Sequence, residues 1–311
     1  MKKTRVLITG GAGYIGSSLV AHLLCDCQVT VLDSLMYDKT SLLIYLTHPN
    51  FVFVKGDARD EVLMQKLLEN TDFVIPLAAM VGAPLCDKFP RESTEINRDA
   101  NLFIARNKKR HVKVIYPCTN SGYGNSDNSK PCTEESQMCP ITLYGKTKVE
   151  AEDEYRKTDN CVTLRLATVF GPSPRMRTDL LVNNFVLKAM REHALVLYED
   201  SFKRNYIHIQ DICSAFRFVI DNWETCKNQT YNVGNDELNC TKRELAEQIS
   251  AVIPSKLYVT ADVSDPDKRD YVVSSQKIYD AGFQCKTNLL TGVLQLQQAY
   301  SLIEESFYAN Y

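Results

Sequence analysis

Short apolar runs alternate with longer helical patterns over the first two-thirds of this 311-residue chain. Six runs rich in β-branched residues predict strands at 5–8, 28–32, 51–54, 72–78, 112–116 and 162–166. Helical patterns lie between them, near 16–25, 59–70, 91–109 and 143–157. The strand runs are apolar throughout, which is typical of strands covered on both faces. This order predicts right-handed βαβ units and therefore an α/β, doubly wound parallel sheet of the Rossmann type.

The rhythm of the pattern changes beyond Gly171. A loop at 171–177 precedes a helical pattern near 179–192, and Thr241-Lys-Arg-Glu244 indicates a capping box that starts a helix running to about Val252. From this order we predict a Rossmann domain of residues 1–171 plus about 205–235. A smaller C-terminal substrate-binding lobe would comprise 172–204 and 236–311.

Composition narrows the classes of function. Apolar residues make up 44% and charged residues 24%, with a net charge of -2, so neither nucleic acid nor a membrane surface is an expected partner. No stretch approaches the ~20 apolar residues of a membrane span, and glycines interrupt the run after Lys2-Lys3. We therefore predict a cytoplasmic protein. The 11 cysteines are irregularly spaced without Cys-x-x-Cys, which predicts reduced thiols and no metal site.

A glycine-rich loop follows the first predicted strand and opens the first predicted helix. It reads Thr9-Gly10-Gly11-Ala12-Gly13-Tyr14-Ile15-Gly16. Glycines at this spacing allow a tight turn and a close approach of a pyrophosphate, while the helix N-terminus offers backbone donors to the phosphates. We expect Gly10, Gly13, Tyr14, Ile15 and Gly16 to bind a dinucleotide.

Three further strand ends fall on the face where such folds bind ligands. Asp33 ends the second strand, where an acid can bind the adenosine ribose hydroxyls and repel a 2′-phosphate, so NAD is favoured over NADP. Asp57 can accept from the adenine amino group, unless it only caps a helix starting near Ala58. The remaining cofactor candidates after the third and fourth strands are Ala58, Leu77, Ala78 and Ala79.

Tyr144 and Lys148 lie four residues apart on a predicted helix and therefore share one face. A phenol is a weak acid, but a nearby ammonium and the positive nicotinamide ring would favour its phenolate form. Thr119, just after the fifth strand, can bridge Tyr144 and a sugar hydroxyl. Together the three side chains suit removal of a proton while a hydride passes to NAD. We expect Tyr144 and Lys148 to bind the cofactor as well, with Lys148 able to hold its ribose.

These motifs occur together and in order, and they resemble the extended short-chain dehydrogenase/reductase family of nucleotide-sugar epimerases and dehydratases. The resemblance covers nearly the whole chain, continuing through Arg165, Gly171-Pro172, Arg204 to His208 with Asp211, and Tyr231 to Gly234. It implies a Rossmann core with a small C-terminal lobe and a homodimer formed through a four-helix bundle. It also assigns the catalytic roles to Thr119, Tyr144 and Lys148.

The resemblance further implies residues that bind the substrate. Arg204 is similar to the family arginine that grips the diphosphate, and Arg269 to an arginine that contacts the nucleotide ribose or phosphate. Asn183 and Asn184 are equal candidates for a second diphosphate contact. Asn120 and Ser121 stand where family dehydratases carry an Asp-Glu acid/base pair, which argues against 4,6-dehydration and makes them candidate sugar contacts.

Two reactions remain after oxidation at sugar carbon 4, release of the ketone or its reduction on the other face. The stretches 77–85, 119–124, 173–183 and 265–271 resemble a branch containing GDP-heptose 4-dehydrogenases of capsule biosynthesis, so a GDP-linked substrate is favoured. A 4-epimerase of the UDP-glucose type is the alternative. Arg175 and Arg177 could bind a substrate phosphate or the carboxylate of a 2-keto acid co-substrate that reoxidises NADH, or they are solvated loop charges. A steroid-type dehydrogenase or a non-catalytic NAD-binding protein is less expected.

Overall fold

A seven-stranded parallel sheet forms the centre of the computed structural model, which describes residues 3–37, 40–126, 130–260 and 269–303. Its order is β10-β6-β5-β4-β1-β2-β3, with every neighbouring pair parallel. This order confirms the expected Rossmann topology. The strands are β1 (Arg5–Thr9), β2 (Gln28–Asp33), β3 (Phe51–Lys55), β4 (Phe73–Pro76), β5 (Lys113–Thr119), β6 (Cys161–Leu166) and β10 (Thr230–Val233).

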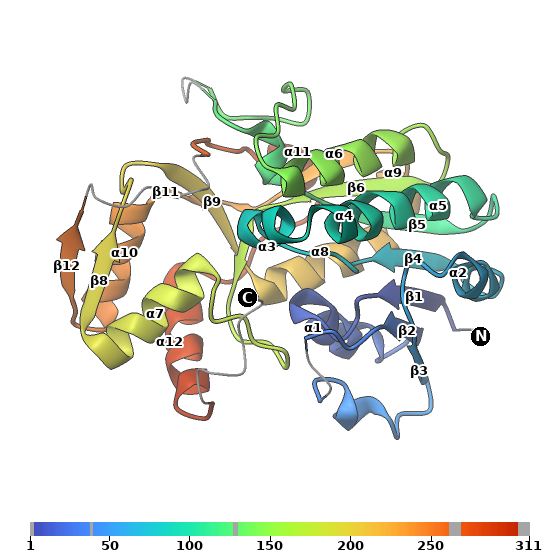
Figure 1. Cartoon of the computed structure of the whole chain (residues 1–311), viewed down its shortest axis with the longest axis horizontal. Helices are drawn as coiled ribbons and strands as arrows, with labels where there is room; N and C mark the ends of the chain where they lie inside the picture. Colours follow the sequence, from blue (N-terminus) through green and yellow to red (C-terminus); the bar gives the residue numbers. More distant parts are fainter. Residues whose placement is uncertain (1–2, 38–39, 127–129, 261–268, 304–311) are drawn as a thin grey trace.

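Helices cover both faces of this sheet (Figure 1). On one face α1 (Tyr14–Leu23) packs against α8 (Ile209–Asp221), and on the other α5 (Ala100–Asn107) packs against α2 (Glu61–Leu68) and α6 (Leu143–Tyr155). Val6 and Ile8 of β1 join the core beneath α1 and α8, whereas Leu7 joins the core beneath α6. Because neighbouring side chains point to opposite faces, both must be apolar, which explains the unbroken apolar runs.

The helix expected over 91–109 is divided in the structure. α3 (Ala83–Lys88) and α4 (Pro90–Thr94) precede a π-helical turn, η2 (Glu95–Asp99), which leads into α5. Asn97 lies in that turn, fully buried, and exchanges two hydrogen bonds with the backbone of Met80, of 2.8 and 2.9 Å. The π turn therefore anchors the segment after β4 to the helix.

A smaller lobe follows β6 and has its own apolar core. It contains a three-stranded sheet in the order β11-β9-β7 and a two-stranded sheet of β8 and β12. The capping box at Thr241 is confirmed, because its hydroxyl accepts from the Glu244 N–H and the Glu244 carboxylate accepts from the Thr241 N–H. The lobe elements are β7 (Thr168–Phe170), α7 (Leu181–Glu192), β8 (Ala194–Leu197), β9 (Lys203–His208), β11 (Asn235–Thr241), α10 (Lys242–Val252), β12 (Lys256–Val259) and α12 (Leu289–Tyr300).

Two elements within 205–235 return to the Rossmann core, α8 on the face of α1 and β10 at the sheet edge. β9, however, belongs to the three-stranded sheet, so the return begins after His208 rather than at about 205. The division into two domains remains a proposal. The short elements are η1 (Leu43–Tyr45), η3 (Asn120–Tyr123), α9 (Trp223–Cys226) and α11 (Gln276–Asp280).

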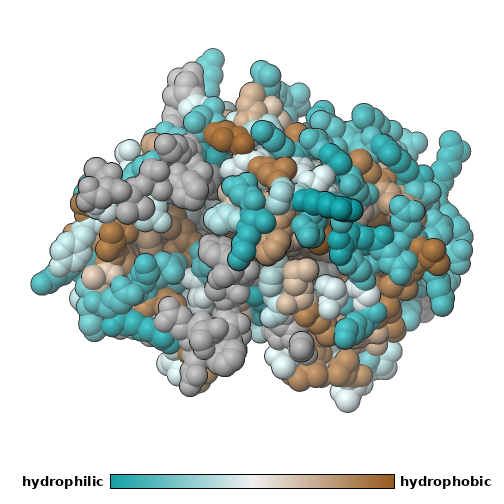
Figure 2. Space-filling model, viewed as in Figure 1, coloured by the Kyte–Doolittle hydropathy of each residue, from teal (hydrophilic) through white to brown (hydrophobic). Residues whose placement is uncertain are grey.

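The outer faces of α5 and α6 are joined by ion pairs. Arg106 pairs with Glu154 at 2.7 Å, and Arg98 of the π turn pairs with Glu150 at 3.1 Å. Figure 2 shows mostly hydrophilic residues over this part of the molecule. Throughout the part of the chain that the structure describes, we find no helix with the length and apolarity needed to cross a bilayer.

Candidate active site

A cavity of about 590 Å³ opens at the carboxyl ends of the central strands, between the sheet and the smaller lobe. Open α/β sheets bind ligands at this edge. Its walls include the segments 10–16 and 77–84 from the Rossmann core. Leu180, Arg204 and Tyr271 contribute from the other side. The fold therefore places a site between residues that lie far apart in the sequence.

The glycine-rich loop forms a tight cradle at the start of α1. Gly10 adopts a φ of +71°, and a Cβ added there would lie 2.5 Å from the Ala78 backbone nitrogen. A Cβ on Gly16 would lie 2.5 Å from the Gly10 carbonyl oxygen. Gly13 caps the helix without a side chain, so the first turn of backbone donors faces the cavity beside Tyr14 and Ile15. This cradle fits the pyrophosphate of a dinucleotide.

Asp33 lies at the end of β2 and lines the cavity. Its two carboxylate oxygens accept from the Ala12 N–H at 2.9 Å and the Leu35 N–H at 2.8 Å. The side chain therefore ties the strand end to the glycine loop while it faces the position expected for the adenosine ribose.

Asp57 also lines the cavity, together with Ala58, Leu77, Ala78 and Ala79. Arg59 pairs with the Asp57 carboxylate at 2.7 Å, and this bond holds the pKa of Asp57 below its usual range. Asp57 does not cap the next helix, because α2 begins at Glu61 and Asp60 is its N-cap. An adenine amino group would therefore meet a carboxylate already paired with an arginine.

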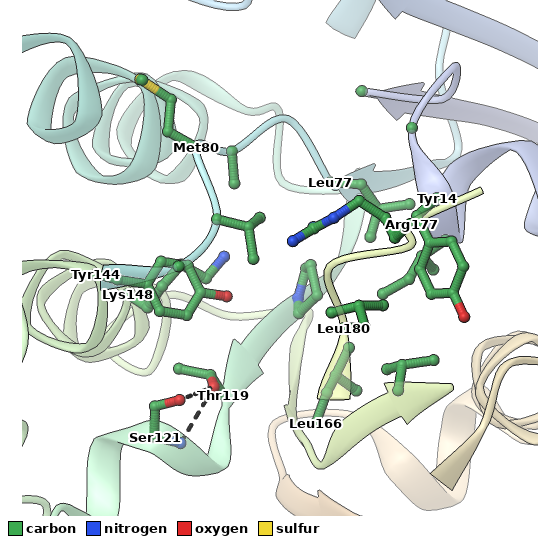
Figure 3. Close-up of a pocket in the computed structure, with 18 of the residues that line it drawn as sticks. Tyr14, Leu77, Met80, Thr119, Ser121, Tyr144, Lys148, Leu166, Arg177 and Leu180 are labelled. Carbon is green, nitrogen blue, oxygen red and sulfur yellow. Dashed lines mark hydrogen bonds between the residues drawn. The ribbon is translucent and has the colours of Figure 1, made fainter. Parts of the chain in front are cut away.

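Thr119, Tyr144 and Lys148 meet in the middle of the cavity. Thr119 ends β5, and the other two side chains lie on the first two turns of α6, which Thr142 caps by accepting from the Gly145 N–H at 3.1 Å. In Figure 3 the Tyr144 hydroxyl and the Lys148 amine project into the cavity above Thr119. The Thr119 hydroxyl donates to the Ser121 hydroxyl at 2.8 Å, and Ser121 also lines the cavity.

The electrostatics differ from our expectation for Tyr144. Burial, followed by the nearby Cys118 thiol, raises the pKa of the phenol well above its usual value. The charges of Arg269 and Arg177 act in the opposite direction but do not outweigh burial. Burial in turn lowers the pKa of Lys148 to about 8, and its ammonium lies 4.3 Å from the Tyr116 ring centroid. The protein alone therefore keeps Tyr144 a neutral phenol.

Arg175 and Arg177 line the cavity and are buried, so they are not solvated loop charges. Arg177 projects toward the cavity centre from the wall opposite Tyr144 (Figure 3) and pairs with Asp179. The Arg175 guanidinium lies 5.4 Å from the Tyr37 ring centroid and donates to the Met176 carbonyl at 2.7 Å. Buried cations close to a reaction centre suit an anionic group on a ligand.

The lobe end of the cavity holds further cations, including residues that the sequence did not reveal. Arg204 and Arg269 line it as expected, and the Arg204 guanidinium lies 5.6 Å from the Tyr271 ring centroid. Lys242, the first residue of α10, was missed, as were the cavity-lining side chains Tyr37, Tyr198, Tyr206 and Tyr271. Tyr206 and Tyr271 lie within the stretches that carry the family resemblance, and that resemblance could have identified them as residues of the site.

Three of the substrate candidates do not line the cavity. Asn183 is fully buried, with its amide bonded to the Gly171 N–H and to the Arg177 carbonyl, so it shapes the loop rather than meeting a ligand. Asn184 donates to the Thr178 carbonyl at 3.2 Å. Asn120 is also fully buried, and neither of its amide atoms has a hydrogen-bond partner among the described residues. Residues 265–268 of the stretch ending at Tyr271 lie outside the described residues.

Comparisons with known proteins agree with this geometry. The profile of the NAD dependent epimerase/dehydratase family matches residues 6–234. The low-salt glycan biosynthesis protein Agl12 of Haloferax volcanii is 30% identical over 292 residues, covering 90% of this chain and 93% of that protein. The chain spans 47 or 48% of the length of three plant relatives, about half of each.

Two solved structures share the fold over nearly the whole chain. A UDP-N-acetylglucosamine 4-epimerase from Methanobrevibacter ruminantium superimposes with a TM-score of 0.83 at 25% identity, covering 97% of this chain and 100% of that one. A dTDP-glucose 4,6-dehydratase from Bacillus anthracis, in complex with NAD, gives 0.84 at 23% identity, with 98% of each chain covered.

Proposed function

The chain belongs to the NAD dependent epimerase/dehydratase family, and on that premise we propose that it oxidises carbon 4 of a nucleotide-activated sugar. NAD is the cofactor of this family. The observation that carries the proposal is that Thr119, Tyr144 and Lys148 face the same cavity as the glycine cradle. A hydroxyl-bearing carbon lying between them would be within reach of both a proton acceptor and a bound dinucleotide.

Each of these side chains has a distinct task in the proposed reaction. Bound NAD supplies the hydride acceptor. Tyr144 takes the proton of the 4-hydroxyl, with Thr119 in hydrogen-bonding reach to orient that hydroxyl. Because the protein alone keeps Tyr144 a neutral phenol, the ammonium of Lys148 and the positive nicotinamide ring of bound NAD would together be needed to favour the phenolate, so that Tyr144 can act as a base.

The nucleotide of the substrate occupies the lobe end in this proposal. Arg204, Lys242 and Arg269 give that end a positive charge suited to a diphosphate, while Tyr198, Tyr206 and Tyr271 offer aromatic surface to the nucleoside. The steroid-type alternative is disfavoured by these cations. The non-catalytic alternative is disfavoured by the complete Thr119, Tyr144 and Lys148 set.

Dehydration is not the reaction that the site supports best. Asn120 and Ser121 follow Thr119 where a dehydratase needs an acid and a base, and Asn120 does not line the cavity. We propose release of the 4-keto product, as in a GDP-heptose 4-dehydrogenase of surface polysaccharide biosynthesis. Support comes from Arg175 and Arg177, which could hold the carboxylate of a 2-keto acid that reoxidises NADH. A 4-epimerase is the alternative, favoured by the likeness to the M. ruminantium epimerase.

Turnover against GDP-, UDP-, dTDP- and CDP-linked sugars tests these proposals. Reduced-nicotinamide absorbance and product NMR are followed together, with and without an added 2-keto acid. A 4-keto product that accumulates only with the keto acid supports the dehydrogenase, and an epimer without net NADH supports the epimerase. A product lacking the 6-hydroxyl would contradict both.

We further propose a cytoplasmic homodimer in which α5 and α6 of two copies pack together. The outer faces of these helices carry ion pairs, so charged side chains would lie within the interface and its strength should depend on salt. Sedimentation at low and high salt tests it, since a sedimentation coefficient of a single chain under both conditions would contradict a dimer.

A further inference from the structure

A buried ion pair lies behind the catalytic helix and takes no part in lining the cavity. Glu152 stands one helical turn after Lys148 on α6, and Arg165 stands on β6. The Arg165 guanidinium meets the Glu152 carboxylate at 2.7 Å, with 2% and 1% of the two side chains exposed. Removing two charges from water costs several kcal/mol per ion, so a buried pair is weak evidence for stability alone. Its presence calls for another reason.

The surrounding bonds fix the carboxylate in one place. Arg165 also donates to the Tyr123 hydroxyl at 2.9 Å and to the Glu134 carbonyl at 3.1 Å. Tyr123 in turn donates to the Asn232 side chain at 2.6 Å. These bonds hold the Arg165 guanidinium on several sides, and the guanidinium in turn holds the Glu152 carboxylate in a fixed position.

Glu152 follows Lys148 by four residues on α6, so the two buried side chains lie on the same face of that helix. β5 presents the Tyr116 ring and the Cys118 thiol, α6 presents Tyr144, and Arg165 on β6 lies beyond Glu152. Burial raises the pKa values of Tyr116 and Cys118 well above their usual ranges, so both are neutral at physiological pH. Burial opposes the charge on Lys148, and a charged Cys118 thiolate or the Glu152 carboxylate would raise its pKa again. Because the Cys118 thiol is neutral at physiological pH, Glu152 is the partner that carries this negative charge.

We propose that Glu152, held by Arg165, is a positioning residue that keeps Lys148 in its ammonium form. The buried anion compensates for the water that Lys148 loses when α6 packs against β5. The charge on Lys148 is what the proposed role of Tyr144 requires, so this inference rests on the proposed function. It gives the buried pair a task that a neutral, equally well packed pair could not perform.

Direct titration of Lys148 tests the inference without any substrate. The protein is prepared with 13Cε-lysine, the Lys148 signal is assigned by its loss in Lys148→Met, and its midpoint is followed by NMR. Glu152→Gln should lower the midpoint by about one pH unit, the effect of losing one nearby opposite charge. Glu150→Gln removes an exposed carboxylate from the same helix and should leave the midpoint unchanged.

A second variant guards against misfolding, since Glu152→Gln leaves Arg165 buried without its charged partner. Glu152→Gln combined with Arg165→Met removes both charges and keeps an apolar side chain of similar length. The inference predicts the lowered midpoint in this variant too. Restoration of the wild-type midpoint in a folded double variant would overturn the inference, as would an unchanged midpoint in both variants.

Activity provides the second readout. The alkaline limb of the kcat/KM profile should move to lower pH together with the Lys148 midpoint. If the midpoint moves but the wild-type protein oxidises no nucleotide sugar, the inference about Lys148 stands and the proposed function fails. If the wild type is active and the midpoint does not move, the function stands and the inference fails.

Discussion

Tyr144 is the side chain on which the proposed chemistry depends most. Replacing it with Phe removes the proton acceptor while keeping the ring, so turnover should fall about 10²–10⁴-fold, the usual contribution of a general base. NAD affinity should change little, because the glycine cradle is untouched. Steady-state rates and fluorescence titration with NADH measure the two effects. Tyr258→Phe, at an exposed position, is the control. Most activity surviving in Tyr144→Phe would remove this residue from the mechanism.

Asp33 offers a test of cofactor choice. Asp33→Asn keeps an oxygen that can accept from the Ala12 N–H, but it removes the charge that repels a 2′-phosphate. The preference for NAD over NADP should therefore fall about tenfold or more, which corresponds to roughly 1.4 kcal/mol. Comparison of kcat/KM for the two cofactors measures it. An unchanged ratio would mean that another residue sets the preference.

Lys148 should make stability depend on pH. Its pKa is lowered from 10.5 to about 8 in the folded protein, so the unfolded chain binds more protons between these values. Stability therefore rises as pH rises through that window, and the buried charge costs on the order of 3 kcal/mol below it. Lys148→Met should unfold at higher urea than the wild type at pH 7, with an advantage that shrinks toward pH 10.5. An equal advantage at both pH values would contradict the assignment.

At the level of elements, the capping box of α10 gives a measurable prediction. Thr241→Ala removes the hydroxyl that accepts from the Glu244 N–H at 3.1 Å. The loss of such a cap should lower the free energy of unfolding by about 1 kcal/mol, and Thr241→Ser should recover most of it. Urea unfolding followed by circular dichroism measures both variants. A serine variant as unstable as the alanine variant would show that the lost methyl group matters more than the cap.

The elements also show how far the sequence could be interpreted. Local sequence sufficed to predict the βαβ order, which follows from the spacing of hydrophobic residues. It also sufficed for the capping box, which a four-residue motif determines. The π turn η2 could not be predicted from local sequence, because the hydrogen bonds between Asn97 and Met80 form only when η2 and the segment after β4 meet.

Some features of the site could likewise be predicted from local sequence, and others depend on the tertiary structure. The cradle and the positions of Thr119, Tyr144 and Lys148 follow from motifs read along the chain. Whether Asn183 would face the ligand depended on how the loop at 171–177 folds over it, and Lys242 entered the wall through the tertiary placement of α10. The high pKa of Tyr144 likewise arises from burial, which no spacing of residues encodes.

Across the whole molecule, charge is segregated along the cavity. Asp33 and Asp57 lie at the dinucleotide end. Toward the substrate five cations, Arg175, Arg177, Arg204, Lys242 and Arg269, outnumber the carboxylate of Asp179, which pairs with Arg177. Salt screens such attraction, so KM for the nucleotide sugar should rise several-fold between about 50 and 500 mM NaCl while NAD affinity changes less. Titrations at several salt concentrations measure the two dependences. Equal slopes for both ligands would contradict this segregation.

The cavity wall runs from Gly10 near one end of the chain to Tyr271 near the other. A ribosome adding about 5–20 residues per second needs roughly 13–50 s to make the stretch between them. The cradle is complete only once Ala78 has been made, and the opposite wall only once Tyr271 has followed, so for most of that interval the nascent chain holds an incomplete cavity. The chain can therefore bind a nucleotide sugar tightly only late in its synthesis, after Tyr271 has been added.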